Sequence, residues 1–274
     1  MRPVLAAFAL ALSCAAAPAI AQIKPPSDHA AGLVSHRAIY DLRLADGSGS
    51  KAPASATGRI AYDFAADCGG YAQTLRQVVD MQPNEGDERI TETRSTTFED
   101  ADGADFRFST ARPASQGGDV DGSAQRDADG ISIALSRPEP FRLSTQSDVL
   151  FPTQHIERII EAARRGDKVM LARVYDGSDN GRHIYNVTTI IGKPARGPDA
   201  DQGAQGPAFR NVARWPVAVA YFPADRRDGL PDYVLSFDLY ENGVSTNLRL
   251  DYGDFVLRGE LTRIEFPPAA RCGR

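Results

Sequence analysis

The chain has 274 residues, of which 42% are hydrophobic and 24% are charged, and its formal net charge is −5. These values are typical of a globular protein and exclude collagen-like, intrinsically disordered and strongly basic chains. An acidic chain without a basic stripe of interleaved aromatic residues is not expected to bind nucleic acid.

Residues 1–21 are predicted to form a secretory signal peptide. The charged Arg2 precedes an apolar run from Val4 to Leu12, and the small-x-small sequence at 19–21 predicts cleavage before Gln22. The apolar run is too short to span a bilayer as a stable helix, and no later stretch of about 20 residues is uncharged and apolar. We therefore expect the mature protein to be soluble and exported, with no stable membrane span.

Three cysteines occur, and their number after export predicts a disulfide. Cys14 follows a sequence that weakly resembles a lipoprotein lipid-attachment box, but Leu12 is one position away from the usual place of that leucine. A cleaved leader is therefore favoured over a lipid anchor. Removal of the leader leaves Cys68 and Cys272, and a cysteine pair in an oxidising compartment is expected to be bridged. Two separate buried thiols are the alternative.

Alternation with period two predicts half-buried antiparallel strands along most of the mature chain. The first strand, at 36–44, places its apolar residues and His36 on one face. Further strands are predicted at 60–64, 71–79, 105–110, 130–136, 168–175, 183–192, 215–222, 233–252 and 254–266. Asn242 and Gly243 predict a type I′ hairpin turn inside 233–252. The pattern favours a single domain at 22–274, mainly β, with a long antiparallel meander.

Helical spacing occurs in one segment, from Pro152 to Gly166. Thr153 is the expected N-cap and Gly166 the expected stop. An apolar stripe lies opposite the charged residues and consists of Ile156, Ile159, Ile160 and Ala163. A single amphipathic helix in a strand meander needs an apolar surface to cover, so we expect it to pack on the concave side of a strongly curved sheet.

Three polar stretches are predicted to be loops. Residues 119–130, "DVDGSAQRDADG", are expected to form a solvated acidic loop. Residues 176–181, "DGSDNG", partly match an EF-hand loop, but Val187 stands where the bidentate glutamate is needed, so a polar turn is favoured over a calcium site. Residues 193–208 are rich in Gly, Pro and Asp and have no periodicity, which predicts a mobile loop.

No sequence motif indicates catalysis. The chain lacks HExxH, GxSxG, a P-loop, GxGxxG and CxxC, so no metal site, cofactor or catalytic residue is expected. His36, His155 and His183 lie in segments expected to be ordered, and structural roles are favoured for them. A hydrolase that uses one of these histidines with an acidic partner is an alternative.

The leader, the cysteine pair and the segments "LVSHRAIYDLRL", "FPTQHIERIIEAARRGD" and "VYDGSDNGRHIYNV" together resemble one family. The chain resembles the EipB family, periplasmic cell-envelope-integrity proteins of Alphaproteobacteria that were formerly classified as a domain of unknown function. The resemblance runs from about Leu33 to Cys272. It implies a β-spiral, a sheet wound into an open, barrel-like shape around one helix and closed by a disulfide that corresponds here to Cys68 and Cys272.

The resemblance also implies a function. The leading hypothesis is a non-catalytic periplasmic protein that maintains cell-envelope integrity by contact with an unknown envelope component or periplasmic protein, and whose loss sensitises cells to detergent and cell-wall stress. The alternative is a carrier or binder of a lipid or lipoprotein acyl chain in the groove of the curved sheet. Small barrels are normally filled by their own side chains, which favours an interior filled by the helix stripe and inward aromatic residues.

Overall fold

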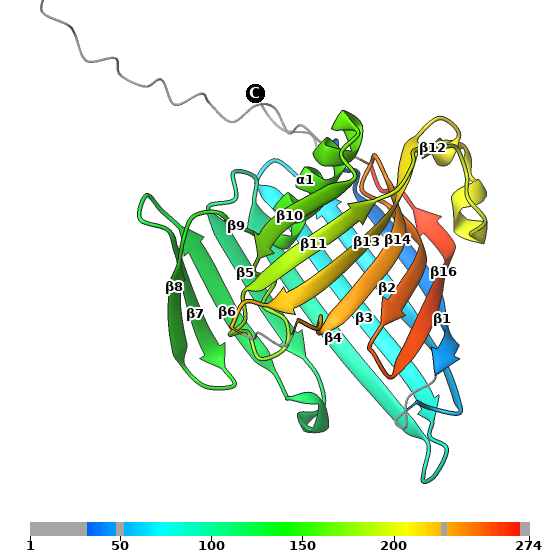
Figure 1. The fold of residues 1–274 in the computed structure, drawn as a ribbon, viewed down its shortest axis with the longest axis horizontal. Helices are drawn as coiled ribbons and strands as arrows, with labels where there is room; N and C mark the ends of the chain where they lie inside the picture. Colours follow the sequence, from blue (N-terminus) through cyan, green and yellow to red (C-terminus); the bar gives the residue numbers. More distant parts are fainter. Residues whose placement is uncertain (1–31, 48–51, 226–228, 269–274) are drawn as a thin grey trace, which may run out of the picture.

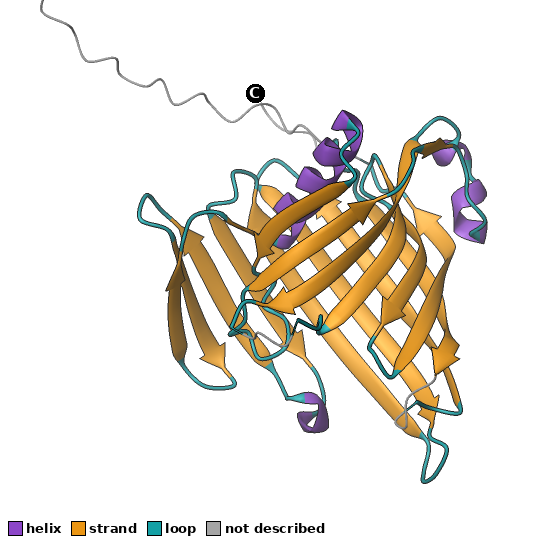
Figure 2. Cartoon of the chain, viewed as in Figure 1, coloured by secondary structure: helices purple, strands orange, loops and turns teal. Residues whose placement is uncertain are grey.

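Sixteen strands and one long helix make up the fold in a computed structural model that describes residues 32–47, 52–225 and 229–268 (Figures 1 and 2). The strands are β1 His36–Gly47, β2 Ser55–Ala66, β3 Gly70–Gln82, β4 Arg89–Asp100, β5 Asp105–Ala111, β6 Val120–Arg126, β7 Ile131–Arg137, β8 Phe141–Thr145, β9 Val149–Leu150, β10 Val169–Val174, β11 Tyr185–Ile191, β12 Ala195–Arg196, β13 Ala213–Pro223, β14 Tyr233–Tyr240, β15 Ser245–Asp251 and β16 Phe255–Glu265. The helices are α1 Pro152–Arg165 and the short 3₁₀ helices η1 Ala114–Gln116, η2 Gln202–Gln205 and η3 Pro207–Phe209.

All the described strands belong to one sheet, which curls into a nearly closed barrel-like shape. The strand order is β8-β7-β6-β5-β4-β3-β2-β1-β16-β15-β14-β13-β11-β10-β9, with β12 paired to β13. Neighbouring strands are antiparallel except for β9 and β10. In Figure 1, β10, β11, β13 and β14 cross in front of β1–β4, so the two halves of the sheet face each other. The predicted class, mainly β with an antiparallel meander in a barrel-like shape around one helix, is confirmed.

The two ends of the strand order meet at a polar seam. β8 and β9 are consecutive in the chain but lie at opposite ends of the order. Arg173 on β10 reaches across to the segment that joins them, donating hydrogen bonds to Thr145 Oγ1 (3.2 Å), Gln146 Oε1 (3.3 Å) and Asp148 Oδ1 (2.9 Å). Side chains therefore hold together two edges that have no backbone ladder between them.

Inward-facing side chains follow the predicted alternation. On β1, His36, Ala38, Tyr40 and Leu42 are buried, and Tyr40 stands opposite Ile60 on β2. The helix packs inside the curve, where Ile159 and Ile160 lie in one core cluster with strands β10, β11, β13 and β14. The predicted position of the helix on the concave side is confirmed.

The N-cap of the helix lies two residues before the predicted N-cap. Phe151 occupies the N-cap and has no capping oxygen, and Gln154 Oε1 accepts the Phe151 backbone N–H at 3.1 Å. Thr153, the predicted cap, is the second residue of the helix, because Pro152 is suited to the first position with its fixed φ. Gly166 ends the helix in a left-handed conformation with φ 84°, as predicted.

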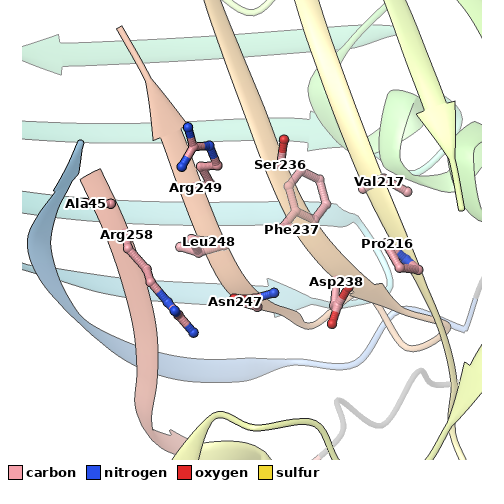
Figure 3. Close-up of a pocket in the computed structure, with 10 residues that line it drawn as sticks. All are labelled: Ala45, Pro216, Val217, Ser236, Phe237, Asp238, Asn247, Leu248, Arg249 and Arg258. Atoms are coloured by element: carbon pink, nitrogen blue, oxygen red, sulfur yellow. The ribbon is translucent and has the colours of Figure 1, made fainter. Parts of the chain in front are cut away.

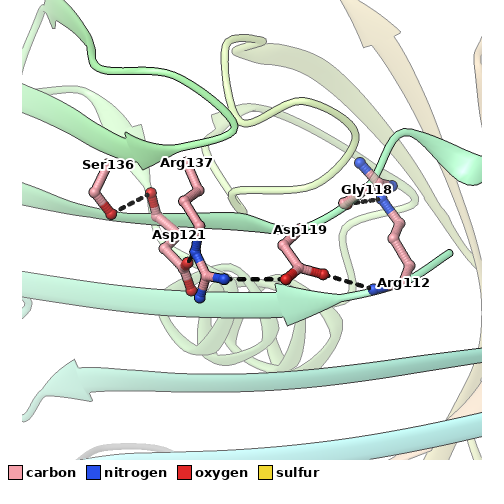
Figure 4. A network of polar contacts seen from close by, with 6 residues as sticks. All are labelled: Arg112, Gly118, Asp119, Asp121, Ser136 and Arg137. Carbon is pink, nitrogen blue, oxygen red and sulfur yellow. Dashed lines mark hydrogen bonds and ion pairs between the residues drawn. The ribbon is translucent and has the colours of Figure 1, made fainter. Parts of the chain in front are cut away.

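The predicted acidic loop at 119–130 is wrong over most of its length, because residues 120–126 form β6. Val120 and Ala124 are fully buried, and the acidic residues around them are paired on the other face. Figure 4 shows Arg137 of β7 between Asp119 and Asp121, with Nη1 at 3.0 Å from Asp119 Oδ2. The acidic residues made the sequence resemble a loop, because the strand buries only two side chains, those of Val120 and Ala124.

The segment 193–208, predicted to be a mobile loop, instead carries β12, η2 and part of η3. Ala204 and the following Phe209 are fully buried and join the core cluster of β1, β2 and β16. Phe209 packs on Tyr240 with ring centroids 4.8 Å apart. The segment is therefore a packed lobe on the sheet, seen beside β12 in Figure 1.

Asp201 anchors this lobe by filling a gap between two strands. Its Oδ2 accepts the backbone N–H groups of Asn247 on β15 and Leu261 on β16, each at 2.8 Å, and only 2% of the residue is exposed. Gly203 lets the lobe approach closely, since a Cβ there would lie 2.7 Å from Leu261 Cγ. One carboxylate thus replaces the missing backbone acceptors where the β15–β16 ladder ends.

The hairpin predicted at Asn242 and Gly243 is present, but the turn type differs. Gly243 has φ 89°, whereas Asn242 is not among the non-glycine residues with positive φ. The Tyr240 N–H donates to Val244 O at 2.8 Å, which gives a three-residue loop with one left-handed residue.

Some predictions fall on residues that the structure does not describe. The signal peptide at 1–21, Cys14 and Cys272 lie outside the described residues, so leader cleavage and the disulfide stay predictions. Cys68 is exposed in the turn between β2 and β3. Within the described part of the chain, no helix combines the length and apolar character needed to cross a membrane.

Candidate functional site: an apolar cavity inside the sheet

An apolar cavity of about 360 Å³ lies inside the curve of the sheet. One wall comes from β1–β3, the other from β14 and β15, and the first turns of α1 contribute Ile156. The lining residues are His36, Tyr40, Ile60, Tyr62, Leu75, Gln77, Ile156, Leu235, Ser236, Phe237, Gly243, Ser245, Leu248, Leu250 and Tyr252. A smaller cavity of about 80 Å³ shares His36, Tyr62 and Ile156 with it and extends toward the start of α1.

Strand alternation explains why these residues line the cavity. Tyr40 pairs across to Ile60, and Ile60 pairs across to Gln77, so one inward row crosses β1, β2 and β3. Leu235 and Leu250 form the matching pair on β14 and β15. Directly opposite residues point to the same face of a sheet, so each register pair adds two side chains to the same wall.

Three polar groups of the lining, on Tyr40, Tyr62 and His36, are bonded within the walls. The Tyr40 hydroxyl donates to Ser245 O at 2.8 Å, and the Tyr62 hydroxyl donates to Gln73 Oε1 at 2.9 Å. His36 Nδ1 lies 2.8 Å from Val34 O, which assigns the proton to Nδ1 and leaves Nε2 as an acceptor. The surface offered to a ligand is therefore mainly carbon.

Burial keeps the titratable groups of the lining neutral. Desolvation raises the pKa of Tyr40 and of Tyr62, and it lowers the pKa of His36 despite its hydrogen bond to Val34 O. The nearby charges that act on the two tyrosines are carboxylates, Asp199 and Asp201 at Tyr40 and Glu99 at Tyr62 among them. The walls thus carry no positive charge toward the cavity.

A buried glutamate fixes the end of α1 that meets the cavity. Glu99 on β4, only 1% exposed, accepts the backbone N–H of Thr153 at 2.6 Å through Oε1 and that of Gln154 at 3.4 Å through Oε2. Burial raises the pKa of Glu99 to about 7, although the hydrogen bonds from Thr153 and Gln154 act in the opposite direction. Glu99 supplies the cap that Phe151 lacks.

Two side-chain contacts support the same helix end. Gln73 Nε2 donates to Thr153 Oγ1 at 3.0 Å, and the Tyr71 hydroxyl donates to Glu157 Oε1 at 2.8 Å. Both donors come from β3, the strand that also brings Leu75 and Gln77 to the cavity. The wall and the helix end are therefore held in one arrangement.

The four predicted groove residues separate into two environments. Ile156 is half-buried and lines the cavity. Ile159, Ile160 and Ala163 are buried in the core cluster around Trp215 on β13. Sequence reasoning missed most of the cavity lining, although all of it except Ile156 lies in the segments 36–44, 60–64, 71–79 and 233–252, which were predicted as strands.

Further depressions on the described part of the molecule include a cleft beside α1 and a hollow over β13–β16. A cleft of about 660 Å³ at the C-terminal end of α1 has Trp215 in its lining and the Arg164–Glu241 ion pair at 2.8 Å. A depression of about 300 Å³ lies over β13–β16, where the β14–β15 register shifts, with Arg249 and Arg258 among its residues (Figure 3). It shares Phe237 and two other residues with the apolar cavity, so one wall separates the two.

The three histidines considered as catalytic candidates have different surroundings. His36 lines the cavity, and the buried His155 packs edge-on to Tyr221, where desolvation lowers its pKa to about 4. His183 has Asp179 and Asp225 carboxylates at 3.5 and 3.3 Å. No cluster of three or more His, Cys, Asp or Glu residues that could hold a metal occurs in the ranges the structure describes.

Comparisons with known proteins agree on one family. The model of the EipB-like family matches residues 27–268. The cell envelope integrity protein EipB of Brucella abortus (strain 2308) is 36% identical over 237 residues, which cover 85% of this chain and 84% of that protein. A crystal structure of a β-barrel-like protein of domain of unknown function DUF1849 from Brucella abortus has 35% identity and a TM-score of 0.78, covering 86% of this chain and 99% of the other.

Proposed function

Because this chain belongs to the EipB-like family, we propose that it maintains cell-envelope integrity as a non-catalytic protein of the periplasm. The extent of the likeness carries the proposal. The matched range includes every described strand and α1, so the whole fold is shared and not one motif. The name of the Brucella relative supplies the role in the envelope.

Features of the chain support the periplasmic part of the proposal. The leader at 1–21 supports export, and the pair Cys68 and Cys272 supports residence in an oxidising compartment. The proposed bridge would attach the C-terminal tail to the turn between β2 and β3. The partner is proposed to be an envelope component or another periplasmic protein.

The environments of the histidines support a non-catalytic role. Near pH 7 both His36 and His155 are neutral, because burial lowers their pKa values. His36 is bonded to the backbone and His155 lies among core residues. These are structural surroundings for two of the three histidines, whereas His183 lies 3.5 and 3.3 Å from the Asp179 and Asp225 carboxylates.

Deletion of the gene tests the proposal. Loss of the protein is expected to sensitise cells to detergent, EDTA and β-lactams, and a plasmid copy of the full chain is expected to restore tolerance. A copy that lacks residues 1–21 serves as the matched control and should fail to restore tolerance, because its product is not exported. Unchanged tolerance in the deletion strain would contradict the proposed role.

The cavity supports a second candidate function, a carrier or binder of a lipid or lipoprotein acyl chain. Its volume of about 360 Å³ and apolar walls match those of small-molecule sites, which are concave, largely apolar and supplied with few polar groups. Native mass spectrometry of protein purified from the periplasm tests this function. Bound lipid mass would support it, and a clean mass of the protein alone would count against it.

A further inference from the structure

We propose that the cavity accepts an uncharged acyl chain, such as an ester- or amide-linked chain of a lipid or lipoprotein, and excludes the ionised form of a free fatty acid. The inference rests on the second candidate function and names the chemical class of its ligand. It follows from the composition of the cavity walls, from the charges behind them and from the shape of the site.

The described walls contain no cation that could pair with an ionised headgroup. Among the described residues, those lining the cavity include no Lys, Arg, Asp or Glu. Tyr40 and Tyr62 already donate their hydroxyl protons to wall acceptors, and the His36 Nδ1 proton is used by Val34 O. The other polar lining residues, Gln77, Ser236, Ser245 and Tyr252, are uncharged, so a carboxylate that entered would lose its hydration without gaining a cation, and that loss is costly.

The charges behind the walls strengthen the exclusion of anions. Asp199 and Asp201 lie on the Tyr40 side, and their fields disfavour a further negative charge beside that wall. Glu99, on the Tyr62 side, adds to this effect only above about pH 7, where it ionises. A neutral ester or amide has no such repulsion, and a protonated acid can donate to an acceptor of the wall such as His36 Nε2.

The shape of the site fits a chain that enters end-on. Tyr252 is 43% exposed, whereas His36, Tyr40 and Ile60 are buried. The smaller cavity continues inward past Ile156. A chain entering beside Tyr252 would bury more methylenes as it lengthens, and each buried methylene is expected to tighten binding about fourfold until the cavity is full.

A matched acid and ester separate the neutral from the ionised ligand. Binding of decanoic acid and of methyl decanoate to the mature protein is measured by calorimetry at pH 5, 6, 7 and 8. The ester is expected to bind equally at each pH. The acid is expected to weaken about tenfold for each pH unit above about 5, because only its neutral fraction binds.

Variants assign the binding to this cavity. Leu235→Trp fills the space between the walls and is expected to weaken ester binding at least tenfold. Ile190→Trp places the same side chain on the outer face of β11, at a residue that is 50% exposed, and is expected to leave binding unchanged. Thermal unfolding of both variants confirms that they are folded, and Ser245→Trp supplies a second filled cavity if Leu235→Trp unfolds.

Each outcome separates the hypotheses. If the acid and the ester bound equally tightly at pH 8, the proposal that the cavity excludes the ionised acid would be wrong. The acyl-chain function would not be affected by that result. Absence of ester binding would overturn both, while the role in envelope integrity is decided independently by the deletion strain. Binding that survives both filled-cavity variants would place the ligand elsewhere and overturn the assignment.

Discussion

Replacing Glu99 with Gln tests which of two opposing effects controls the end of α1 beside the cavity. Burial favours the neutral carboxyl, whereas backbone N–H donors and the positive end of the helix favour the carboxylate. The Glu99 pKa of about 7 lies above its ordinary value of 4.5, so the effect of burial is larger than that of the N–H donors. The amide of Gln keeps an oxygen for Thr153 N–H but cannot ionise, so it removes the titration with little change in shape.

The expected pH dependence follows from linkage. A carboxyl whose pKa is 4.5 in the unfolded chain and about 7 in the folded protein keeps its proton longer when folded. Its contribution to stability is complete below pH 4.5 and is lost as the pH rises to about 7. The free energy of unfolding of the wild type, relative to Glu99→Gln, should fall by about 1.4 kcal/mol per pH unit in this window, or about 3 kcal/mol in all.

Urea unfolding at pH 5, 6, 7 and 8, followed by the fluorescence of the single tryptophan, measures this difference. Trp215 is buried against α1, so its emission reports the core that the helix covers. Glu161→Gln, on the exposed side of the same helix, is the control and should change stability by less than about 1 kcal/mol. A flat difference curve, or a wild type that gains stability with rising pH relative to Glu99→Gln, would refute the reasoning and show that the helix end keeps Glu99 ionised.

Three further changes test the packing. Asp201→Ala leaves the buried Leu261 N–H and the part-buried Asn247 N–H without an acceptor and should cost about 2–4 kcal/mol in urea unfolding. Asp201→Asn, which keeps one oxygen, should cost less than half of that, and equal losses would contradict the role of the oxygen. Ile159→Ala should cost about 2–5 kcal/mol, and Ile190→Ala on the outer face less than about 1, so similar values for both would contradict the assigned core. Cys272→Ser should lower the melting temperature, because the proposed bridge closes a long loop and contributes at most about 5 kcal/mol to the free energy of unfolding. An unchanged melting temperature would argue against a stabilising bridge.

Strands were predictable where burial and polarity alternate together. On β1 and β11 buried and exposed residues alternate, and the sequence shows that alternation directly. The strand β4 was missed because its sequence, "RITETRSTTFED", alternates charged residues with threonine and serine, so hydrophobicity has no period. Residues 120–126 were missed because β6 buries only small side chains, Val120 and Ala124. Alternation of apolar and polar residues therefore identifies strands that bury several large apolar side chains, and it fails for strands that bury few or small ones.

The candidate site was predictable in part. The helical spacing of Ile156, Ile159 and Ile160 predicted a helix against the curved sheet. The inward face of 36–44 contained His36 and Tyr40. The acceptors that hold the site together carry no local signal. Glu99 and Asp201 stand among other acidic residues, Asp100 and Asp199 being their neighbours, and each bonds to backbone 46 or more residues away. Long-range pairing of this kind depends on which strands the curled sheet brings together, and a short window of sequence does not contain that information.

The cavity follows from a mismatch between the helix and the sheet it covers. A helix of 14 residues is about 21 Å long, whereas a 12-residue strand such as β1 or β2 extends about 40 Å. The single helix therefore fills the curve beside β10–β14 and reaches the β1–β3 wall only with its first turns, through Ile156 and through the bonds from Gln73 and Tyr71. Aromatic and aliphatic side chains cover the rest of that wall without meeting a second helix. The space left over is apolar because it belongs to the same inward face that forms the core, and this origin makes a neutral chain its most suitable occupant.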